Sequence, residues 1–184
     1  MFKNFVVIKE INNNVSLDDF YKSLFGAAIK LEKTGEFTVI YHNIDDEELI
    51  KNSLLTLGDD LLLLITAYIS NPLYDLKEEL RIALNLLSDA KSGVYNLKTI
   101  LLSNDDIKIK SDVFSLITDN MGIDANFIKV FVKNNLNTTK SAKELFIHRN
   151  TMIYKLDRFQ RERNFDLRCF IDCFILYNLL DSKL

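Results

Sequence analysis

The hydrophobic periodicity of this chain changes near Ser103. Before that residue, short apolar segments typical of strands alternate with segments whose apolar residues recur every three to four positions, as they do in helices. After a polar stretch at residues 104–111, only the helical period remains. The change predicts an α+β domain over residues 1–103, a linker over 104–111 and an all-α domain over 112–184.

The first domain is expected to contain four strands and three helices. Strands are predicted at Phe5–Ile8, Glu36–Tyr41, Leu61–Ile69 and Val94–Tyr95, and helices at Ser16–Lys33, Asp45–Leu57 and Leu76–Ala90. These elements alternate without long, uniform strand–helix–strand units. The pattern therefore predicts a small α/β sandwich, within an overall α+β fold class.

The second domain is expected to be entirely helical. Its helices are predicted at Asp112–Asn120, Asp124–Asn134, Thr138–Phe146, Thr151–Arg163 and Leu167–Leu180. The chain has only five Gly and one Pro in 184 residues, which argues against a turn-dense all-β fold. The sequence contains no apolar run near the roughly 18 residues of a membrane helix and no signal-peptide pattern. A cytoplasmic location and no membrane partner are therefore expected.

Positive charge is concentrated in one part of an otherwise acidic chain. The formal net charge is −3, yet residues 129–168 carry ten basic and four acidic residues, a net charge of +6. The rest of the chain, with 13 basic and 22 acidic residues, has a net charge of −9. A basic block of this kind is typical of an element that binds a polyanion. A solvated helical surface would have the same composition, so that alternative stays open.

Residues 137–163, which read NTTKSAKELFIHRNTMIYKLDRFQRER, have the pattern of a helix-turn-helix motif. Ala142 is small where two helices must cross closely, and Leu145 and Ile147 supply apolar contacts around the turn. Asn150 is the expected N-cap of the second helix, which would then begin at Thr151.

The second helix of this motif has two different faces. The apolar face is formed by Met152, Ile153, Leu156 and Phe159, and the opposite face by Thr151, Tyr154, Lys155 and Arg158. The polar groups of the opposite face suit base edges in a DNA major groove. Flanking groups suited to phosphate are those of Thr138, Thr139, Lys140, Lys143, Arg149 and Arg161. The alternative is a protein-interaction module that does not bind DNA and uses the same basic helix for an acidic partner.

The run SAKELFIHRNTMIYKL at residues 141–156 resembles the signature A-x-x-L-x-I-H-R-N-T-x-x-Y-[RK]-L of PucR/CdaR-type bacterial transcription regulators. Their C-terminal domain binds DNA, and generic helix-turn-helix proteins lack the His-Arg-Asn-Thr element. The resemblance covers roughly residues 112–182. It implies a regulator that binds double-stranded DNA as a homodimer. His148 is expected to fix the turn or meet a phosphate, and Asn150 to hold the DNA backbone. Lys155 stands where the family commonly has Arg, and Lys lacks the bidentate fork of Arg.

The first domain is similar, more weakly, to the degenerate GGDEF-like domain that precedes this motif in CdaR-type regulators. The resemblance rests on the order of elements and on the run ALNLLSDAKSGV at residues 83–94. A working diguanylate cyclase would need an intact Gly-Gly-Asp/Glu-Glu-Phe loop and carboxylates for Mg²⁺ near the first strand. Here the hairpin reads TGEF at residues 34–37, and Lys9-Glu10 follows the first strand. The resemblance implies no enzymatic activity and a role in dimerisation or in reception of an unknown small-molecule effector.

No metal or cofactor is predicted. Cys169 and Cys173 lie one helical turn apart, but no nearby His or acidic cluster completes a set of four ligands. The acidic run at residues 45–48 fits the first turn of a helix without any cation, because the helix dipole favours negative charge there.

Overall fold

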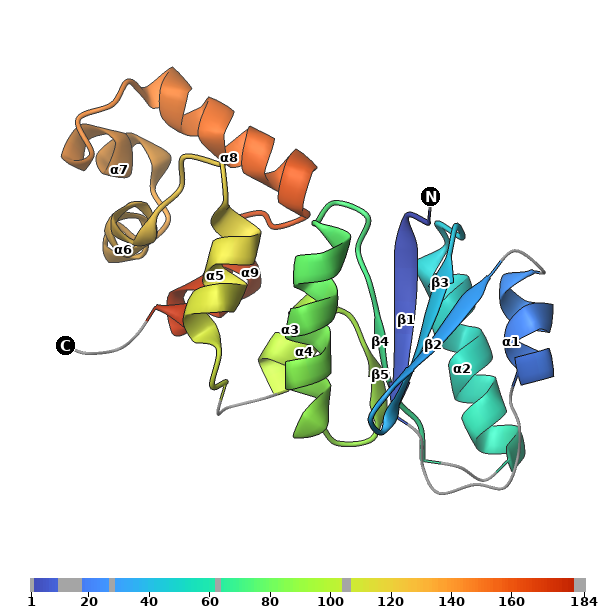
Figure 1. Ribbon diagram of the computed structural model, residues 1–184. Coiled ribbons are helices and arrows are strands. Elements are labelled where there is room, and N and C mark those ends of the chain that lie inside the picture. Colours follow the sequence, from blue (N-terminus) through green and yellow to red (C-terminus); the bar gives the residue numbers. More distant parts are fainter. Residues whose placement is uncertain (1, 10–17, 27–28, 62–63, 104–106, 181–184) are drawn as a thin grey trace. The chain divides into compact units, whose positions relative to one another are not determined.

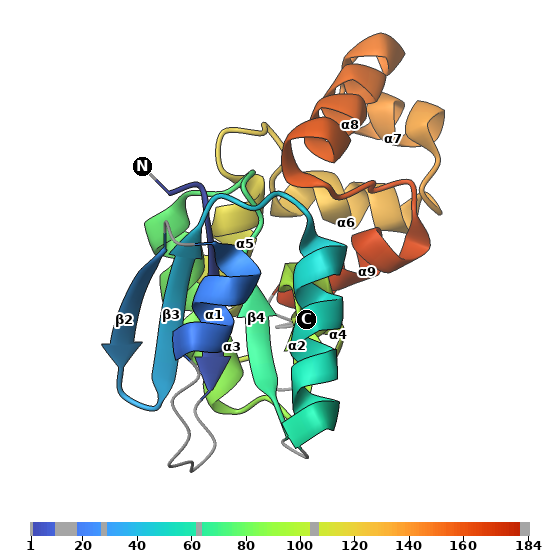
Figure 2. The same cartoon turned by 90° about the vertical axis from the view of Figure 1, so that its right-hand side faces the viewer.

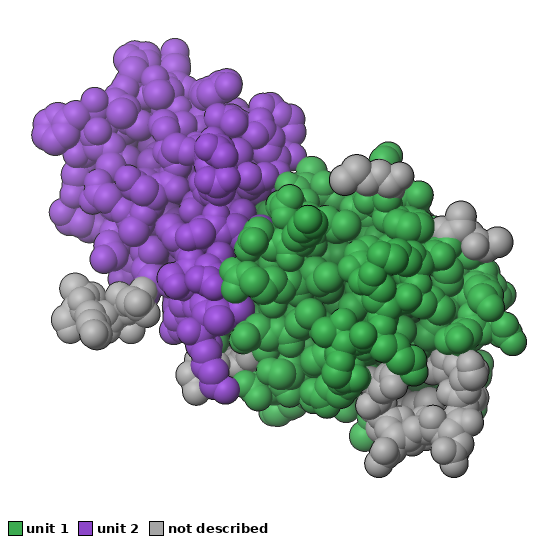
Figure 3. Space-filling view, viewed as in Figure 1, with its two compact units in different colours: residues 1–107 green, residues 108–184 purple. Residues whose placement is uncertain are grey.

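The computed structural model describes residues 2–9, 18–26, 29–61, 64–103 and 107–180 (Figure 1). The chain divides into two compact units, residues 1–107 (unit 1) and residues 108–184 (unit 2), which Figure 3 shows in green and purple. Unit 1 contains a β-sheet with helices, whereas the described part of unit 2 is helical. The predicted α+β fold class is therefore confirmed.

Unit 1 is built on a five-stranded sheet. Its elements are β1 (Asn4–Lys9), α1 (Asp18–Phe25), β2 (Lys30–Thr34), β3 (Phe37–His42), α2 (Glu47–Leu61), β4 (Thr66–Ile69), α3 (Leu76–Ser88), β5 (Gly93–Tyr95) and α4 (Leu97–Ser103). The strand order is β2-β3-β1-β4-β5. Only β4 and β5 run parallel; the other neighbouring strands are antiparallel.

Helices cover both faces of this sheet, as Figures 1 and 2 show. On one face, Val6 and Ile8 of β1 pack with Tyr21 of α1 and with Ile50 and Leu54 of α2 in a buried apolar cluster. Successive side chains of a strand point to opposite faces, so the neighbouring residues of β1 face the other way. On that second face α3 packs against β1 and β4. The result is the sandwich that the alternating pattern predicts.

The expected helix Ser16–Lys33 is wrong in its second half. Helix α1 ends at Phe25, Gly26 has a φ of +81°, and β2 begins at Lys30. Strand β2 pairs with β3 through the turn at Gly35, which also has a positive φ. Leu31 fits a helical period in the sequence, but cross-strand pairing with Ile40 decides its conformation. Ser16, the expected start, lies outside the described residues.

Two further elements differ from the expectation. The strand predicted at Leu61–Ile69 is shorter, because α2 continues to Leu61 and β4 begins only at Thr66. Helix α4 (Leu97–Ser103) was not predicted at all. Its first turn is held by Asn96, whose Oδ1 accepts a hydrogen bond from the backbone N–H of Thr99 (3.0 Å).

Unit 2 contains the five predicted helices with shifted ends. They are α5 (Lys110–Thr118), α6 (Ala125–Lys133), α7 (Thr138–Glu144), α8 (Arg149–Arg163) and α9 (Phe170–Leu179). Its core includes the fully buried Ile117, Ile128, Phe131, Phe165 and Leu176. Among the helices of the described residues, none is both long enough and apolar enough to cross a membrane.

A buried carboxyl lies between α3 and β4 in unit 1. Glu79 has no exposed surface, and its Oε1 accepts hydrogen bonds from the Tyr68 hydroxyl (2.8 Å) and from the backbone N–H of Asn71 (2.9 Å). Its Oε2 has no hydrogen-bond partner among the described residues. Burial raises the pKa of Glu79 to about 8, so this side chain is mostly protonated at neutral pH.

Replacing Glu79 with Gln is expected to flatten the pH dependence of stability. The folded chain keeps a proton on Glu79 up to about pH 8, whereas the unfolded chain releases it near the ordinary value of 4.5. The free energy of unfolding therefore falls as pH rises through this window, by up to about 1.4 kcal/mol per pH unit. Urea unfolding of the full chain, followed by tyrosine fluorescence at pH 6.5, 7.3 and 8.0, checks this expectation.

The matched control is Glu78→Gln, one residue earlier on α3, where the side chain is exposed and paired with Arg81 (3.2 Å). Burial also lowers the pKa of His42, to about 4, but this imidazole affects stability only below its ordinary pKa of 6.5 and so does not interfere. If the wild type and Glu79→Gln show the same slope above pH 6.5, the buried carboxyl is not protonated.

Candidate nucleic-acid interface

The turn between α7 and α8 is closed by backbone hydrogen bonds. Helix α7 starts at the N-cap Asn137, whose side chain accepts from the backbone N–H of Lys140 (2.9 Å). At its other end, the N–H of Ile147 donates to the Ala142 carbonyl (3.0 Å), and the N–H of Phe146 donates to the Lys143 carbonyl (3.3 Å). Together with the left-handed conformation of Phe146 (φ 55°), these bonds form a Schellman motif. The direction in which the chain enters α8 is therefore fixed.

Helix α8 begins two residues earlier than the sequence predicts. Its N-cap is His148, whose Nδ1 accepts a hydrogen bond from the backbone N–H of Asn150 (3.2 Å). The predicted cap, Asn150, is instead the second residue of the helix, so the predicted start at Thr151 is wrong. An imidazole nitrogen can accept this bond as an amide oxygen does, and the sequence alone did not distinguish the two residues. The expectation that His148 fixes the turn agrees with this bond.

Helix α8 is held by its apolar face. Met152, Leu156 and Phe159 have no exposed surface, and Ile153 is half-buried. At the contact between α7 and α8, Ala142 is 2% exposed, as expected of a small residue where two helices cross. Burial of one side of α8 leaves the opposite side facing outward.

The exposed side of α8 begins in its first turn. Arg149, Asn150, Thr151 and Tyr154 are all exposed, and so is His148 just before the helix. On α7, Thr139, Lys140 and Lys143 are exposed, whereas Thr138 is half-buried. Helix N-termini carry partial positive charge and free backbone N–H groups, both of which favour a bound anion. The structure thus brings most of the predicted polar residues to the surface of α7 and the start of α8.

Two residues of the predicted groove-reading face are already engaged within the protein. The Nζ of Lys155 donates to the carbonyl of Gly122 (2.6 Å), in the loop between α5 and α6. The Nε of Arg158 lies 3.1 and 3.2 Å from the two carboxylate oxygens of Glu162. This hydrogen bond lowers the pKa of Glu162 and raises that of Arg158, so both groups are charged at neutral pH.

Other basic residues of the region are paired with carboxylates. Lys133 is paired with Glu144 (2.7 Å), and Arg168 with both Asp157 (2.7 Å) and Asp166 (2.8 Å). Arg161 approaches Glu162 at 3.7 Å. Within the described part of the chain, no carboxylate pairs with Lys140, Lys143 or Arg149. Cations without a carboxylate partner therefore include these three on α7 and the first turn of α8, together with the exposed Lys129 of α6 and Lys155, which is bound to a carbonyl.

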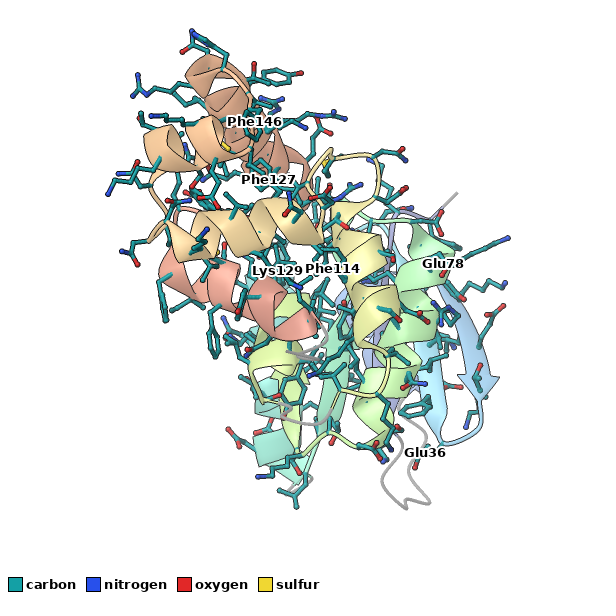
Figure 4. All side chains as sticks on the ribbon, turned by 90° about the vertical axis from the view of Figure 1, so that its left-hand side faces the viewer. Glu36, Glu78, Phe114, Phe127, Lys129 and Phe146 are labelled. Carbon is teal, nitrogen blue, oxygen red and sulfur yellow. The ribbon has the colours of Figure 1, made fainter. Side chains whose placement is uncertain are left out.

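Phe146 is an exposed residue that the sequence pattern does not identify as part of the site. It lies in the turn between α7 and α8, where Figure 4 labels it, and the residue is 96% exposed. In the sequence it stands between Leu145 and Ile147, so the apolar run suggests a core residue. Phe146 has a left-handed backbone conformation, and its side chain is exposed while those of its two neighbours are half-buried.

The surface of α7 and α8 is suited to binding a polyanion. No group of three or more His, Cys, Asp or Glu residues that could hold a metal ion occurs among the described residues. Cys173 is buried and Cys169 is exposed. The surface of α7 and α8 instead offers cations, hydroxyls and backbone N–H groups, the donors that contact phosphates and base edges.

Comparison with known proteins agrees with this geometry. Residues 125–180 match the family of the PucR C-terminal helix-turn-helix domain, so the resemblance predicted for the C-terminal region is confirmed. The uncharacterized protein YxkF of Bacillus subtilis (strain 168) is 36% identical to this chain over 50 residues. That match covers 27% of this chain and only 17% of YxkF.

A solved structure is similar over nearly the whole chain. It is a regulator of polyketide synthase expression from Bifidobacterium adolescentis, with a TM-score of 0.50 and 15% sequence identity. The similarity covers 96% of this chain and 77% of that one. At this identity the likeness is one of fold. It extends the similarity from the helix-turn-helix domain to unit 1.

Replacing Lys155 with Met tests whether this lysine holds the α5–α6 loop. The change keeps the aliphatic stem but removes the donor to the Gly122 carbonyl, which is expected to lower the free energy of unfolding by about 1 kcal/mol. Urea unfolding of the full chain, with hydrogen exchange followed in residues 119–124, measures the effect.

The control is Lys143→Met on α7. The Lys143 ammonium has no hydrogen-bond or ion-pair partner among the described residues, so stability is expected to stay the same. A Lys155→Met variant with unchanged stability and unchanged hydrogen exchange would contradict a role for Lys155 in positioning the loop.

Proposed function

We propose that this protein is a transcription regulator that binds double-stranded DNA through α7 and the exposed side of α8. The observation that carries the proposal is the set of exposed, uncompensated cations Lys140, Lys143 and Arg149 around the exposed first turn of α8. In helix-turn-helix proteins this end of the second helix contacts base edges in the major groove. The match of residues 125–180 to the PucR-type domain supports the same function.

The proposed contacts fall into two classes. Lys140, Lys143, Arg149 and Arg161 bind phosphates, assisted by Thr138, Thr139, His148 and Asn150. Phosphate contacts set the register of the protein on the duplex and carry most of the salt-dependent affinity. Thr151 and Tyr154 face the groove and contact base edges directly.

Lys155 and Arg158 contribute to this interface by exchanging partners. Each is bound within the free protein, Lys155 to the Gly122 carbonyl and Arg158 to Glu162. A DNA acceptor must offer at least as good a hydrogen bond before either group leaves its present partner. We therefore assign to Arg158 a role in discriminating between sequences, with a smaller share in overall affinity.

Unit 1 is proposed to serve dimerisation or reception of a small-molecule signal, as a non-catalytic GGDEF-like domain would. A homodimer places two recognition helices on half-sites one helical turn apart, about 34–36 Å along the duplex. The proposed boundaries are residues 1–103 for this domain, 104–111 for the linker and 112–184 for the DNA-binding domain; α5 begins at Lys110, so its first two residues fall within the proposed linker. We place the protein in the cytoplasm, where its DNA would be.

Binding of the full chain to bulk duplex DNA tests the proposal, with an electrophoretic shift assay at about 50 to 200 mM salt. Strong binding at low salt that weakens steeply with salt is expected. No shift even at the lowest salt would overturn DNA binding and favour the alternative of an acidic protein partner for the same helix.

Lys143→Ala is expected to weaken binding to all duplex sequences alike and to reduce the slope of log K against log salt concentration by about one. The reason is that one phosphate contact releases about one counterion. The same salt series measures it, and Lys129→Ala, on α6 and outside the proposed surface, is the matched control. An unchanged slope would show that Lys143 makes no phosphate contact.

Arg158→Ala is expected to weaken binding to a preferred site, selected from a random duplex library, about tenfold more than binding to random DNA. Loss of a base contact removes discrimination, whereas loss of a phosphate contact does not. Competition between the selected site and random duplex measures the ratio. Arg161→Ala, on the same helix and assigned to phosphate, is expected to leave that ratio unchanged. Equal weakening on both DNAs by Arg158→Ala would assign Arg158 to the backbone instead.

A further inference from the structure

Phe146 occupies a backbone position that normally favours glycine. It is the first residue beyond the C-cap Leu145 of α7, with a φ of 55°. Residues with a Cβ are disfavoured in the left-handed region, and bulky ones most of all. The two backbone hydrogen bonds of the Schellman motif nevertheless hold Phe146 in this conformation. Its presence here therefore needs an explanation other than local backbone preference.

Packing within the chain does not supply that explanation. Phe146 is 96% exposed, a larger exposed fraction than that of any other large apolar residue described. The adjacent Leu145 and Ile147 are half-buried, so they account for the apolar contacts of the turn. Folding thus gains almost no apolar burial from Phe146 while it accepts a disfavoured backbone conformation.

The surroundings of Phe146 indicate a partner that is anionic. Lys143 precedes it by three residues and Arg149 follows it by three, and both are exposed without a carboxylate partner among the described residues. The closed turn holds the ring beside the N-terminus of α8, the end that enters a major groove in helix-turn-helix proteins. Figure 4 shows Phe146 at this end of unit 2. An apolar side chain between two such cations suits a surface that combines phosphates with an exposed apolar group.

We propose that Phe146 contacts the 5-methyl groups of thymine in the major groove and so gives the protein a preference for thymine beside the bases that α8 reads. This inference rests on the proposed DNA binding. The thymine methyl is the apolar group that a base edge presents in the major groove, and Phe is among the residues that contact it. The closed turn already fixes the backbone of Phe146, so binding needs no further ordering of the main chain at this position.

The test compares two polymers that differ only in this methyl group, poly(dA-dT) and poly(dA-dU). The full-length wild type is expected to bind poly(dA-dT) roughly fourfold more tightly, the effect of burying one methyl group. Phe146→Gly is expected to bind both polymers equally, with the affinity that the wild type has for poly(dA-dU). Fluorescence anisotropy at fixed salt measures all four affinities.

The Gly substitution also distinguishes a contact of Phe146 with thymine from a contribution of Phe146 to the stability of the fold. Gly adopts a φ of 55° without strain, so Phe146→Gly is expected to keep or raise the melting temperature. The matched control is Phe170→Ala, which removes another exposed ring (72% exposed) from α9, outside the proposed surface. It is expected to preserve the fourfold preference.

Three other outcomes would contradict the inference, and they distinguish loss of the methyl contact from loss of DNA binding. Equal binding of the two polymers by the wild type, with the salt slope of Lys143→Ala still reduced, leaves DNA binding intact and rejects the methyl contact. A preference that persists in Phe146→Gly assigns the methyl contact to another residue. No binding of either polymer at low salt overturns the proposed function itself, and a protein partner would then be sought for Phe146.

Discussion

The burial of Met152, Leu156 and Phe159 determines how α8 is presented. These three residues lie at the first, fifth and eighth positions of one helical face, and none has exposed surface. Their burial fixes the rotation of α8 about its own axis, because residues at this spacing share one side of a helix. The opposite side must then face outward, with Thr151 and Tyr154 on it. The closed turn before Arg149 also fixes the residue at which α8 begins.

Part of this arrangement could be predicted from the sequence because it depends on local patterns. The period of Met152, Leu156 and Phe159 is a property of neighbouring residues, and the sequence gives it directly. The bond of Lys155 to Gly122 was not predictable, since the two residues are 33 positions apart and a mainchain carbonyl leaves no mark in the sequence. The end of α1 illustrates the same limit, because Leu31 satisfies a helical period and only pairing with Ile40 of β3 makes it part of a strand. Local periodicity predicts helices well. It does not predict which distant carbonyl a side chain will bond or which strand a segment will pair with.

The charge count of residues 129–168 does not show which of their cations are paired with carboxylates in the folded chain. The net charge of +6 over residues 129–168 treats all cations as equivalent. In the folded chain, Glu144, Asp157 and Asp166 compensate Lys133 and Arg168. The cations left without a carboxylate partner include Lys140, Lys143 and Arg149 on α7 and at the start of α8, together with Lys129 and Lys155. Coulomb interactions between exposed groups decay within about 10 Å at ordinary salt, so the local distribution decides where an anion binds.

The pairing of Arg158 with Glu162 bears on the proposed discrimination between DNA sequences. The pair lies along one helix and is partly exposed, and pairs of this kind contribute little to stability. Exchange of Glu162 for a phosphate oxygen replaces one anion with another, so it yields little net free energy. A guanine edge offers two acceptors, N7 and O6, in the plane of the guanidinium, whereas the other base edges do not offer this pair to Arg. In the proposed complex, Arg158 exchanges Glu162 for a guanine edge that accepts two hydrogen bonds, and the internal pair competes with any acceptor that offers fewer.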